Sequence, residues 1–265
     1  MPTVREKKEP GFLDQLRRVR RQTIKIGGMK LIRALAGFLG AQSKVGNTPL
    51  LDTGHFSFLP AFIENWPMIR DEVKEILKYR EAVPPFQKVS TDQMRIAKDD
   101  NWRTFVLFAL GTKMAKNCRH APVTTKLLEQ VPDLQTAWFS ILAPGYHIPA
   151  HRGVTKGIVR AHLGLLVPVD QDKCRMRVDT EICVWRPGEI FVFDDTYEHE
   201  VWNDTKEERV ILLFDFDRPM RFWGRALHAV IVWLIMKTAY YQEPIKRMQD
   251  FEERFEAATR TTKTH

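Results

Sequence analysis

The chain of 265 residues has only three cysteines, Cys118, Cys174 and Cys183, and no Cys-x-x-Cys pair. This scarcity excludes a disulfide scaffold and a cysteine-based zinc knuckle. The sequence also lacks an apolar run of the roughly 18 residues that a bilayer-spanning helix needs, and its first ten residues are too polar for a secretory signal peptide. We therefore expect a cytoplasmic protein. Its 44% hydrophobic content is enough to form a folded core, which excludes wholesale disorder.

The formal net charge of +8 is confined to an N-terminal arm, residues 1–45, which holds eleven Lys or Arg and three Asp or Glu. Basic and apolar residues alternate there at helical spacing, which predicts a basic amphipathic helix. Such a helix suits an anionic membrane surface, the body of the protein itself, or nucleic acid. We favour the membrane surface and expect no nucleic-acid partner. The apolar stripes are Phe12, Leu16, Val19 and Ile26, then Leu31, Ile32, Leu35, Phe38 and Leu39.

A second apolar segment, residues 226–236, lies near the C-terminus and is interrupted only by His228. Arg221, Arg225 and Lys237 flank it. The segment is too short to cross a bilayer, so it lies either in a membrane interface or in the protein core. The chain thus divides into the basic arm (1–45), a central domain (46–220) and a helical tail (221–265).

The central domain begins with helical patterns and ends in a β-rich region. Residues 60–80 and 122–131 have helical spacing, the second with a capping-box-like start at Thr124. At about 135–220, short β-rich runs alternate with turn signals, which is typical of an all-β barrel or sandwich. The runs are 138–142, 159–167, 175–178, 182–185, 190–193, 199–202 and 209–216.

Histidine and arginine residues stand at the ends of these predicted strands. His151 precedes one strand, and His199 opens another. Two imidazoles on facing strands can hold Fe(II) and leave positions open for a bidentate cosubstrate and O₂. Arg209 follows on the next strand, after a turn at residues 203–204, among apolar neighbours where a buried guanidinium needs an anion. Arg160 and His162 share one face of their strand, which suggests a lined pocket.

Long ordered motifs surround these positions. They are residues 121–129, 140–147, 151–153, 160–165 and 193–202, followed by Arg209. Together they resemble the aspartyl/asparaginyl β-hydroxylase family over roughly residues 95–220. The resemblance implies a double-stranded β-helix, a jelly-roll or cupin-like core with flanking helices, and hydroxylation that depends on Fe(II), 2-oxoglutarate and O₂.

The resemblance also implies roles for single residues. His151 and His199 would be the iron ligands. Gly153 stands where most 2-oxoglutarate oxygenases carry an acidic third ligand, so the site would be completed by water, or by chloride in a halogenase. The cosubstrate would contact Arg209 through its distal carboxylate, with Ser140 and His162 assisting and Arg160 close by.

Four further polar side chains near these positions allow more than one interpretation. His147 is either an extra ligand or packs beside the turn at residues 144–145, and we favour packing. Asp194, Asp195 and Glu198 precede His199, and we interpret them as turn residues, one of which orients a ligand.

The substrate is open at this stage. Residues 47–50, 65–70 and 209–222 are similar to a lipid branch of the family, which adds a hydroxyl at C2 of an ester-linked acyl chain. We expect ornithine lipid, at the inner face of the cytoplasmic membrane, with no protein partner. The alternatives are lipid A, an aspartyl or asparaginyl side chain of a protein, and a degenerate β-helix that only binds.

Overall fold

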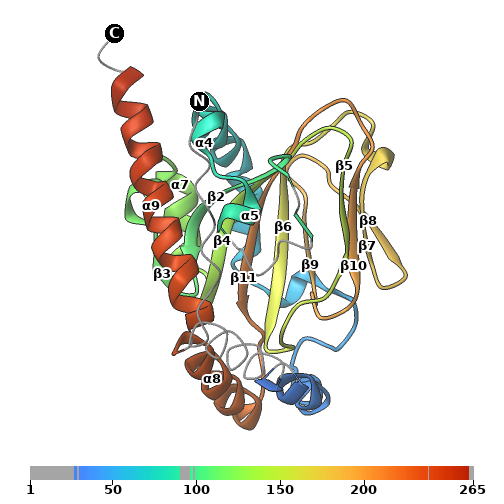
Figure 1. The fold of residues 1–265 in the computed structure, drawn as a ribbon. Helices are drawn as coiled ribbons and strands as arrows, with labels where there is room; N and C mark the ends of the chain where they lie inside the picture. The colour runs from blue at the N-terminus through green and yellow to red at the C-terminus, as the bar shows by residue number, and fades with distance from the viewer. Residues whose placement is uncertain (1–26, 29, 90–95, 98, 238, 263–265) are drawn as a thin grey trace, which may run out of the picture.

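The computed structural model describes residues 27–262 except 29, 90–95, 98 and 238, so the arm stripe from Phe12 to Ile26 lies outside it. Two antiparallel sheets face one another, and helices α4, α7 and α9 cover the far side of the larger one (Figure 1). The larger sheet has the strand order β1-β9-β6-β11-β4-β2-β3 and the smaller one β5-β10-β7-β8. This two-sheet jelly roll with flanking helices confirms the expected fold class.

The elements have the following bounds. The helices are α2 (Ala36–Ala41), α3 (Leu59–Glu64), α4 (Trp66–Leu77), α5 (Phe86–Val89), α6 (Ala115–Arg119), α7 (Pro122–Leu128), α8 (Phe222–Met236) and α9 (Ala239–Thr262). The strands are β1 (Leu50–Leu51), β2 (Trp102–Ala109), β3 (Thr112–Lys113), β4 (Leu134–Leu142), β5 (Tyr146–His151), β6 (Ile158–Leu166), β7 (Cys174–Val178), β8 (Glu181–Val184), β9 (Ile190–Phe193), β10 (His199–Asn203) and β11 (Arg209–Asp217).

Strand β11 shows how the sheet divides its side chains between two cores. Val210, Leu212 and Phe214 pack into the cluster that lies under the helices. Ile211 and Leu213 point the other way, into the space between the two sheets. Because side chains alternate along a strand, Arg209 is also directed between the sheets. The functional interior is therefore the inter-sheet space, and the helices support its back wall.

Most of the predicted helices and strands form where expected, but β2 is missing from the prediction. All eight of its residues are buried, and it pairs with β4 inside the larger sheet. A strand buried on both faces has no alternation between apolar and polar residues, so the pattern for a half-buried strand does not detect it. Arg103 also makes this strand hard to recognise, because it is a charged residue at a buried position. Its guanidinium donates hydrogen bonds to backbone carbonyls, including that of Val83 at 2.7 Å.

The expected capping box at Thr124 is wrong. Helix α7 begins at Pro122, and its N-cap residue provides no side-chain hydrogen bond. Glu72 of α4 caps it instead, accepting from the backbone N–H groups of Val123 and Thr124 at 2.6 and 3.0 Å. A carboxylate at a helix N-terminus accepts hydrogen bonds from the unpaired N–H groups and interacts favourably with the helix dipole. A partner distant in sequence thus replaces the local cap.

The C-terminal tail consists of α8 and α9. His228 of α8 is buried and its Nε2 contacts the Asp217 carboxylate at 3.0 Å, so the helix packs against the end of β11. None of the helices in the described part of the chain combines the length and apolar character needed to cross a membrane.

Candidate active site

The two predicted histidine ligands lie side by side in the smaller sheet. His151 ends β5 and His199 begins β10, and they are direct partners in the strand register, with ring centres 4.0 Å apart. They are thus on paired neighbouring strands of one sheet. A β-bulge follows His199 in this pairing, at the rim of the core.

Backbone carbonyls determine which ring nitrogens are available. The Nδ1 atom of His151 contacts the Pro149 oxygen at 2.9 Å, and that of His199 contacts the Tyr197 oxygen at 3.0 Å. A carbonyl only accepts, so each Nδ1 carries the proton and each Nε2 carries the lone pair. The Nε2 atom of His199 is buried without a hydrogen-bond partner. Burial lowers the pKa of His199 to about 3, which keeps this imidazole neutral, as a metal ligand must be.

Arg209 lies in the opposite sheet, which corrects the expected adjacency to His199. β10 belongs to the smaller sheet and β11 to the larger, and the chain crosses between them after Asn203. The amide of Asn203 donates to the carbonyls of Ala143 and Glu207, at 3.0 and 2.9 Å, and so holds this crossing. Strands β10 and β11 therefore do not form a hairpin, and Arg209 lies across the core from the histidine pair.

The Arg209 guanidinium is buried without a counter-charge. The residue is 2% exposed, and its Nε has no hydrogen-bond partner. No carboxylate in the described part of the chain forms an ion pair with it, and its guanidinium lies 4.6 Å from the centre of the Trp185 ring. Burial lowers the pKa of Arg209 to about 10. A buried cation without an anion is costly, so this geometry fits a carboxylate ligand.

A row of rings connects the guanidinium to the histidine pair. The centre of the Trp185 ring lies 6.0 Å from that of His162, which lies 5.0 Å from Phe193, and Phe193 lies 5.6 Å from His199. Neither ring nitrogen of His162 has a hydrogen-bond partner among the described residues. Burial lowers the pKa of this imidazole well below its usual range. The indole N–H of Trp185 is also buried and unpaired. No sequence motif marks Trp185, which tertiary packing alone brings here.

Arg160 and Ser140 already have protein partners. Arg160 faces the inter-sheet space as expected, but its Nε and Nη2 donate to Asp215 at 2.6 and 2.9 Å, and it lies 3.4 Å from an oxygen of Asp195. Ser140 accepts a hydrogen bond from the indole N–H of Trp102 at 3.1 Å. The charge of Arg160 is therefore balanced inside the protein, in contrast to that of Arg209.

Gly153 and Asp195 occupy the position beside the histidine pair. A Cβ atom on Gly153 would lie 2.0 Å from the Asp195 Oδ1, so the carboxylate fills the space of any side chain at 153. Burial raises the pKa of the Asp195 carboxyl to about 7, although Arg160 opposes the shift. Among the described residues, no group of three or more His, Cys, Asp or Glu is arranged to hold a metal ion. The histidine pair is thus the protein's candidate donor set.

We predict that Gly153→Ala destabilises the protein by about 1–3 kcal/mol, as overpacking of a filled site does. The control is Gly37→Ala, because nothing lies within 4 Å of a Cβ at Gly37. Thermal or urea unfolding of both variants without added metal measures the difference. Equal stability of the two variants would mean that the Asp195 side chain moves aside without cost.

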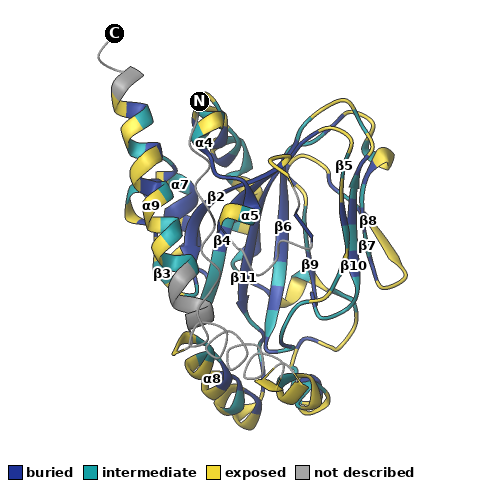
Figure 2. Cartoon of the chain, in the orientation of Figure 1, coloured by how far each residue is buried: buried dark blue, intermediate teal, exposed yellow. Residues whose placement is uncertain are grey.

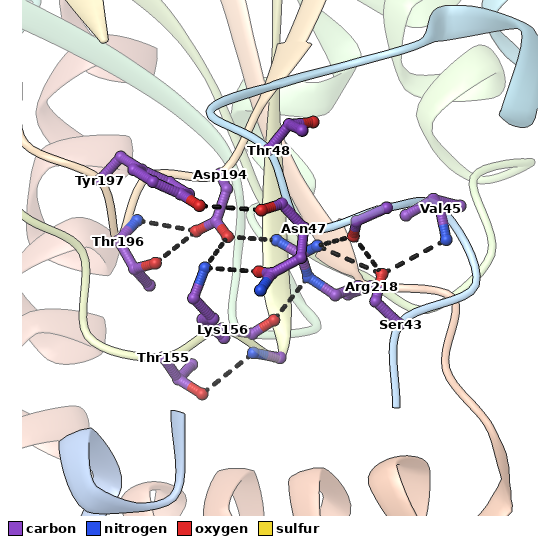
Figure 3. Close-up of polar contacts among 12 residues, drawn as sticks. Ser43, Val45, Asn47, Thr48, Thr155, Lys156, Asp194, Thr196, Tyr197 and Arg218 are labelled. Carbon is purple, nitrogen blue, oxygen red and sulfur yellow. Dashed lines mark hydrogen bonds and ion pairs between the residues drawn. The ribbon is translucent and has the colours of Figure 1, made fainter. Parts of the chain in front are cut away.

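Asp194 is the centre of a buried polar network at the same end of the core (Figure 3). It accepts from the Thr196 N–H and hydroxyl, which confirms the expected turn role, and from Lys156 Nζ at 2.8 Å. It also pairs with Arg218 at 2.5 Å, and both side chains are fully buried. Arg218 in turn donates to the backbone oxygens of Gly46 and Lys156. The network ties together residues 43–47, the loop after β5, the turn before β10 and the end of β11.

We predict that Asp194→Ala costs about 3–5 kcal/mol of unfolding free energy, because it leaves the buried Arg218 charge without its carboxylate. The matched control is Asp204→Ala, which removes the exposed Arg175–Asp204 pair and should leave stability nearly unchanged. Urea denaturation followed by tryptophan fluorescence gives both values. A small effect of Asp194→Ala would mean that the carbonyls alone support Arg218.

His147 lies outside the site. It lies in strand β5, directly after the turn at residues 144–145, beside which it was expected to pack. Its ring stacks on Trp202 with centres 5.5 Å apart, and its Nε2 contacts Glu200 at 2.7 Å on the exposed face of the sheet. The packing interpretation fits this geometry, and the extra-ligand alternative does not.

Comparison with known proteins identifies the class. A family model described as Aspartyl/Asparaginyl beta-hydroxylase matches residues 63–219, which include both histidines and Arg209. The protein is a jelly-roll hydroxylase of the Fe(II)/2-oxoglutarate type. It belongs to the aspartyl/asparaginyl β-hydroxylase family.

Two relatives and one solved structure illustrate the range of similarity. The chain is 39% identical over 215 residues to the ornithine lipid ester-linked acyl 2-hydroxylase of Rhizobium tropici, covering 81% of this chain and 76% of that protein. It is 30% identical over 192 residues to the human aspartyl/asparaginyl beta-hydroxylase, covering 71% of this chain but only 24% of the human protein. A prolyl-4-hydroxylase structure from Pseudomonas putida is 18% identical, with a TM-score of 0.36, and covers 62% of this chain and 100% of that one.

Proposed function

We propose that His151 and His199 hold Fe(II) through their Nε2 atoms and that Arg209 binds the distal carboxylate of 2-oxoglutarate. The observation that carries this proposal is the buried guanidinium of Arg209, which forms no ion pair among the described residues and lies across the core from the paired imidazoles. When bound, iron and the cosubstrate supply the oxidant that is made from O₂ and that converts a C–H bond into C–OH.

The chain's own residues orient the cosubstrate and keep water out. Arg209 supplies a fixed charge that attracts a dicarboxylate and sets its direction. His162 stays neutral because its pKa is lowered, so it donates or accepts a hydrogen bond without adding charge. The aromatic walls formed by Trp185 and Phe193 exclude water, which strengthens each of these polar contacts. Ser140 and Arg160 complete the polar lining on the larger sheet.

The proposed substrate is a membrane lipid, hydroxylated at C2 of an ester-linked acyl chain, with ornithine lipid as the first candidate. The 39% identity to the Rhizobium tropici enzyme over most of both chains supports this choice over a protein side chain, since the human relative is 30% identical. Such a substrate places the enzyme at the inner face of the cytoplasmic membrane.

Mass spectrometry tests the substrate directly. The purified protein is incubated with Fe(II), 2-oxoglutarate and O₂, and with ornithine lipid in mixed micelles, lipid A, or peptides that contain Asp or Asn. One added oxygen on the ester-linked chain of ornithine lipid is the expected product. Unchanged ornithine lipid with hydroxylated peptide or lipid A would overturn the choice of substrate. A chlorinated product would overturn hydroxylation, and no product with any substrate would favour the binding-module alternative.

A further inference from the structure

One side of α8 is apolar and exposed. Gly224, His228 and Ile231 face the protein and are buried. The opposite side exposes large hydrophobic side chains, including Trp223 at 69% and Trp233 at 57%, and it is the yellow side of α8 in Figure 2. The exposed apolar residues of α8 are Phe222, Trp223, Val230, Trp233, Leu234 and Met236.

The helical segment before and including α2 packs against α8 and also carries exposed apolar residues. Leu39, Met220 and Ile231 form a small core that joins the segment to α8. Leu31 and Phe38 remain 60% and 45% exposed on it. We call the exposed apolar residues of these two helices the two-helix face. Exposed apolar side chains that gather on two packed helices mark a surface that meets another body.

The charges around the two-helix face have one sign. Residues 27–44 and 221–237 contain six Lys or Arg and no Asp or Glu. All six are exposed: Lys30, Arg33, Lys44, Arg221, Arg225 and Lys237. A second copy of the chain would bring the same six cations into contact, which is repulsive. An anionic bilayer surface attracts them, and tryptophan side chains anchor well at its interface.

The two-helix face lies at the end of the core that holds His151 and His199, which we call the histidine end. A Cβ on Gly157 would lie 1.9 Å from the His228 ring, so α8 packs directly beneath the loop that leaves His151. The Gly157 carbonyl also accepts from the backbone N–H of Arg218, a member of the Asp194 network. Figure 1 shows α8 at this end of the two sheets.

We propose that the two-helix face docks the protein on an anionic membrane surface, with the histidine end of the core toward the lipid. The choice of a membrane as partner rests on the proposed lipid function. The docking proposal goes further, because it says how the acyl chain of a membrane lipid would come near the site. The face penetrates the interfacial region without crossing the bilayer, since its apolar side chains belong to helices that are packed on the protein.

Vesicle sedimentation of the full-length protein tests the proposal. The vesicles contain phosphatidylcholine alone or with one quarter phosphatidylglycerol. The wild type should bind the anionic vesicles, and Trp223→Ser/Trp233→Ser should bind them at least about tenfold more weakly, since buried apolar area sets interfacial affinity. Arg221→Gln/Arg225→Gln/Lys237→Gln should lose about fivefold per charge on anionic vesicles only. The matched control, Val169→Ser/Ile182→Ser, removes exposed apolar residues elsewhere and should bind as the wild type does.

Other occupants of the face give different results. Unchanged vesicle binding by the tryptophan variant, with lost binding when Arg17, Arg18, Arg20 and Arg21 become Gln, would overturn the proposal in favour of the N-terminal arm. A dimeric wild type and a monomeric tryptophan variant in light scattering, with equal vesicle binding by both, would overturn the proposal in favour of a second copy of the chain.

A separate readout distinguishes this proposal from the proposed function. The tryptophan variant should still hydroxylate ornithine lipid dispersed in detergent micelles at the wild-type rate, because both tryptophan side chains are exposed on α8, on the side opposite its buried residues. Wild-type binding to anionic vesicles without any lipid hydroxylation would contradict the proposed substrate and leave the docking face supported. A wild type that does not bind anionic vesicles would overturn the docking face, whatever the substrate is.

Discussion

Arg209→Met should abolish tight binding of 2-oxoglutarate while leaving the ligand-free protein at least as stable as the wild type. Removing one partner of a buried charge pair costs about 2–5 kcal/mol, which corresponds to about a 30-fold to several-thousand-fold rise in Kd. Stability does not fall, because methionine replaces a buried cation that has no carboxylate partner among the residues that the structure describes. Calorimetric titration with Mn(II) in place of iron measures the Kd, and thermal unfolding measures the stability.

The matched control for this prediction is Arg186→Met. Arg186 is exposed and pairs with nearby Glu189 on the surface, so its loss should change neither the Kd nor the unfolding temperature. Added 2-oxoglutarate should raise the unfolding temperature of the wild type and of the control, but not of Arg209→Met. Full 2-oxoglutarate affinity in Arg209→Met would refute the role assigned to this guanidinium.

His199→Ala should remove metal binding and turnover together. Loss of a residue that only supports a metal ligand costs 10–100-fold in affinity, so loss of one of two protein ligands should cost more than about 100-fold. His151→Ala should behave alike, because the two rings are partners in the strand register. Anaerobic titration with Mn(II), followed by electron paramagnetic resonance, measures the metal affinity without any need for turnover.

His147→Ala is the control for the histidine prediction. It removes an imidazole from the same strand as His151, but on the exposed face where it stacks on Trp202. Metal affinity and turnover should remain those of the wild type. An equal loss in the His147 variant would show that the strand as a whole, and not the histidine pair, was disturbed, and circular dichroism would then reveal the changed fold.

Local patterns in the sequence were sufficient to predict most of the secondary structure. In β6, Arg160 and His162 were expected to share one face because the two-residue period of a strand is a local property, and Ala161 between them packs into the core on the other side of the sheet. Arg209 could also be recognised as a cation among apolar residues, and the structure places no carboxylate of the described chain beside it. The fully buried strand β2 had no such period, so it escaped prediction.

The sequence by itself therefore predicted the types of most elements, the jelly-roll class through the family resemblance, and the candidate residues for the proposed chemistry. Only the tertiary structure decided that β10 and β11 lie in opposite sheets, that Arg160 is neutralised by Asp215, and that Asp195 fills the space at Gly153. Each of these joins residues far apart in the chain, or depends on the direction that a loop takes. Local patterns contain no information about such partners, because the contacts exist only after the sheets have packed.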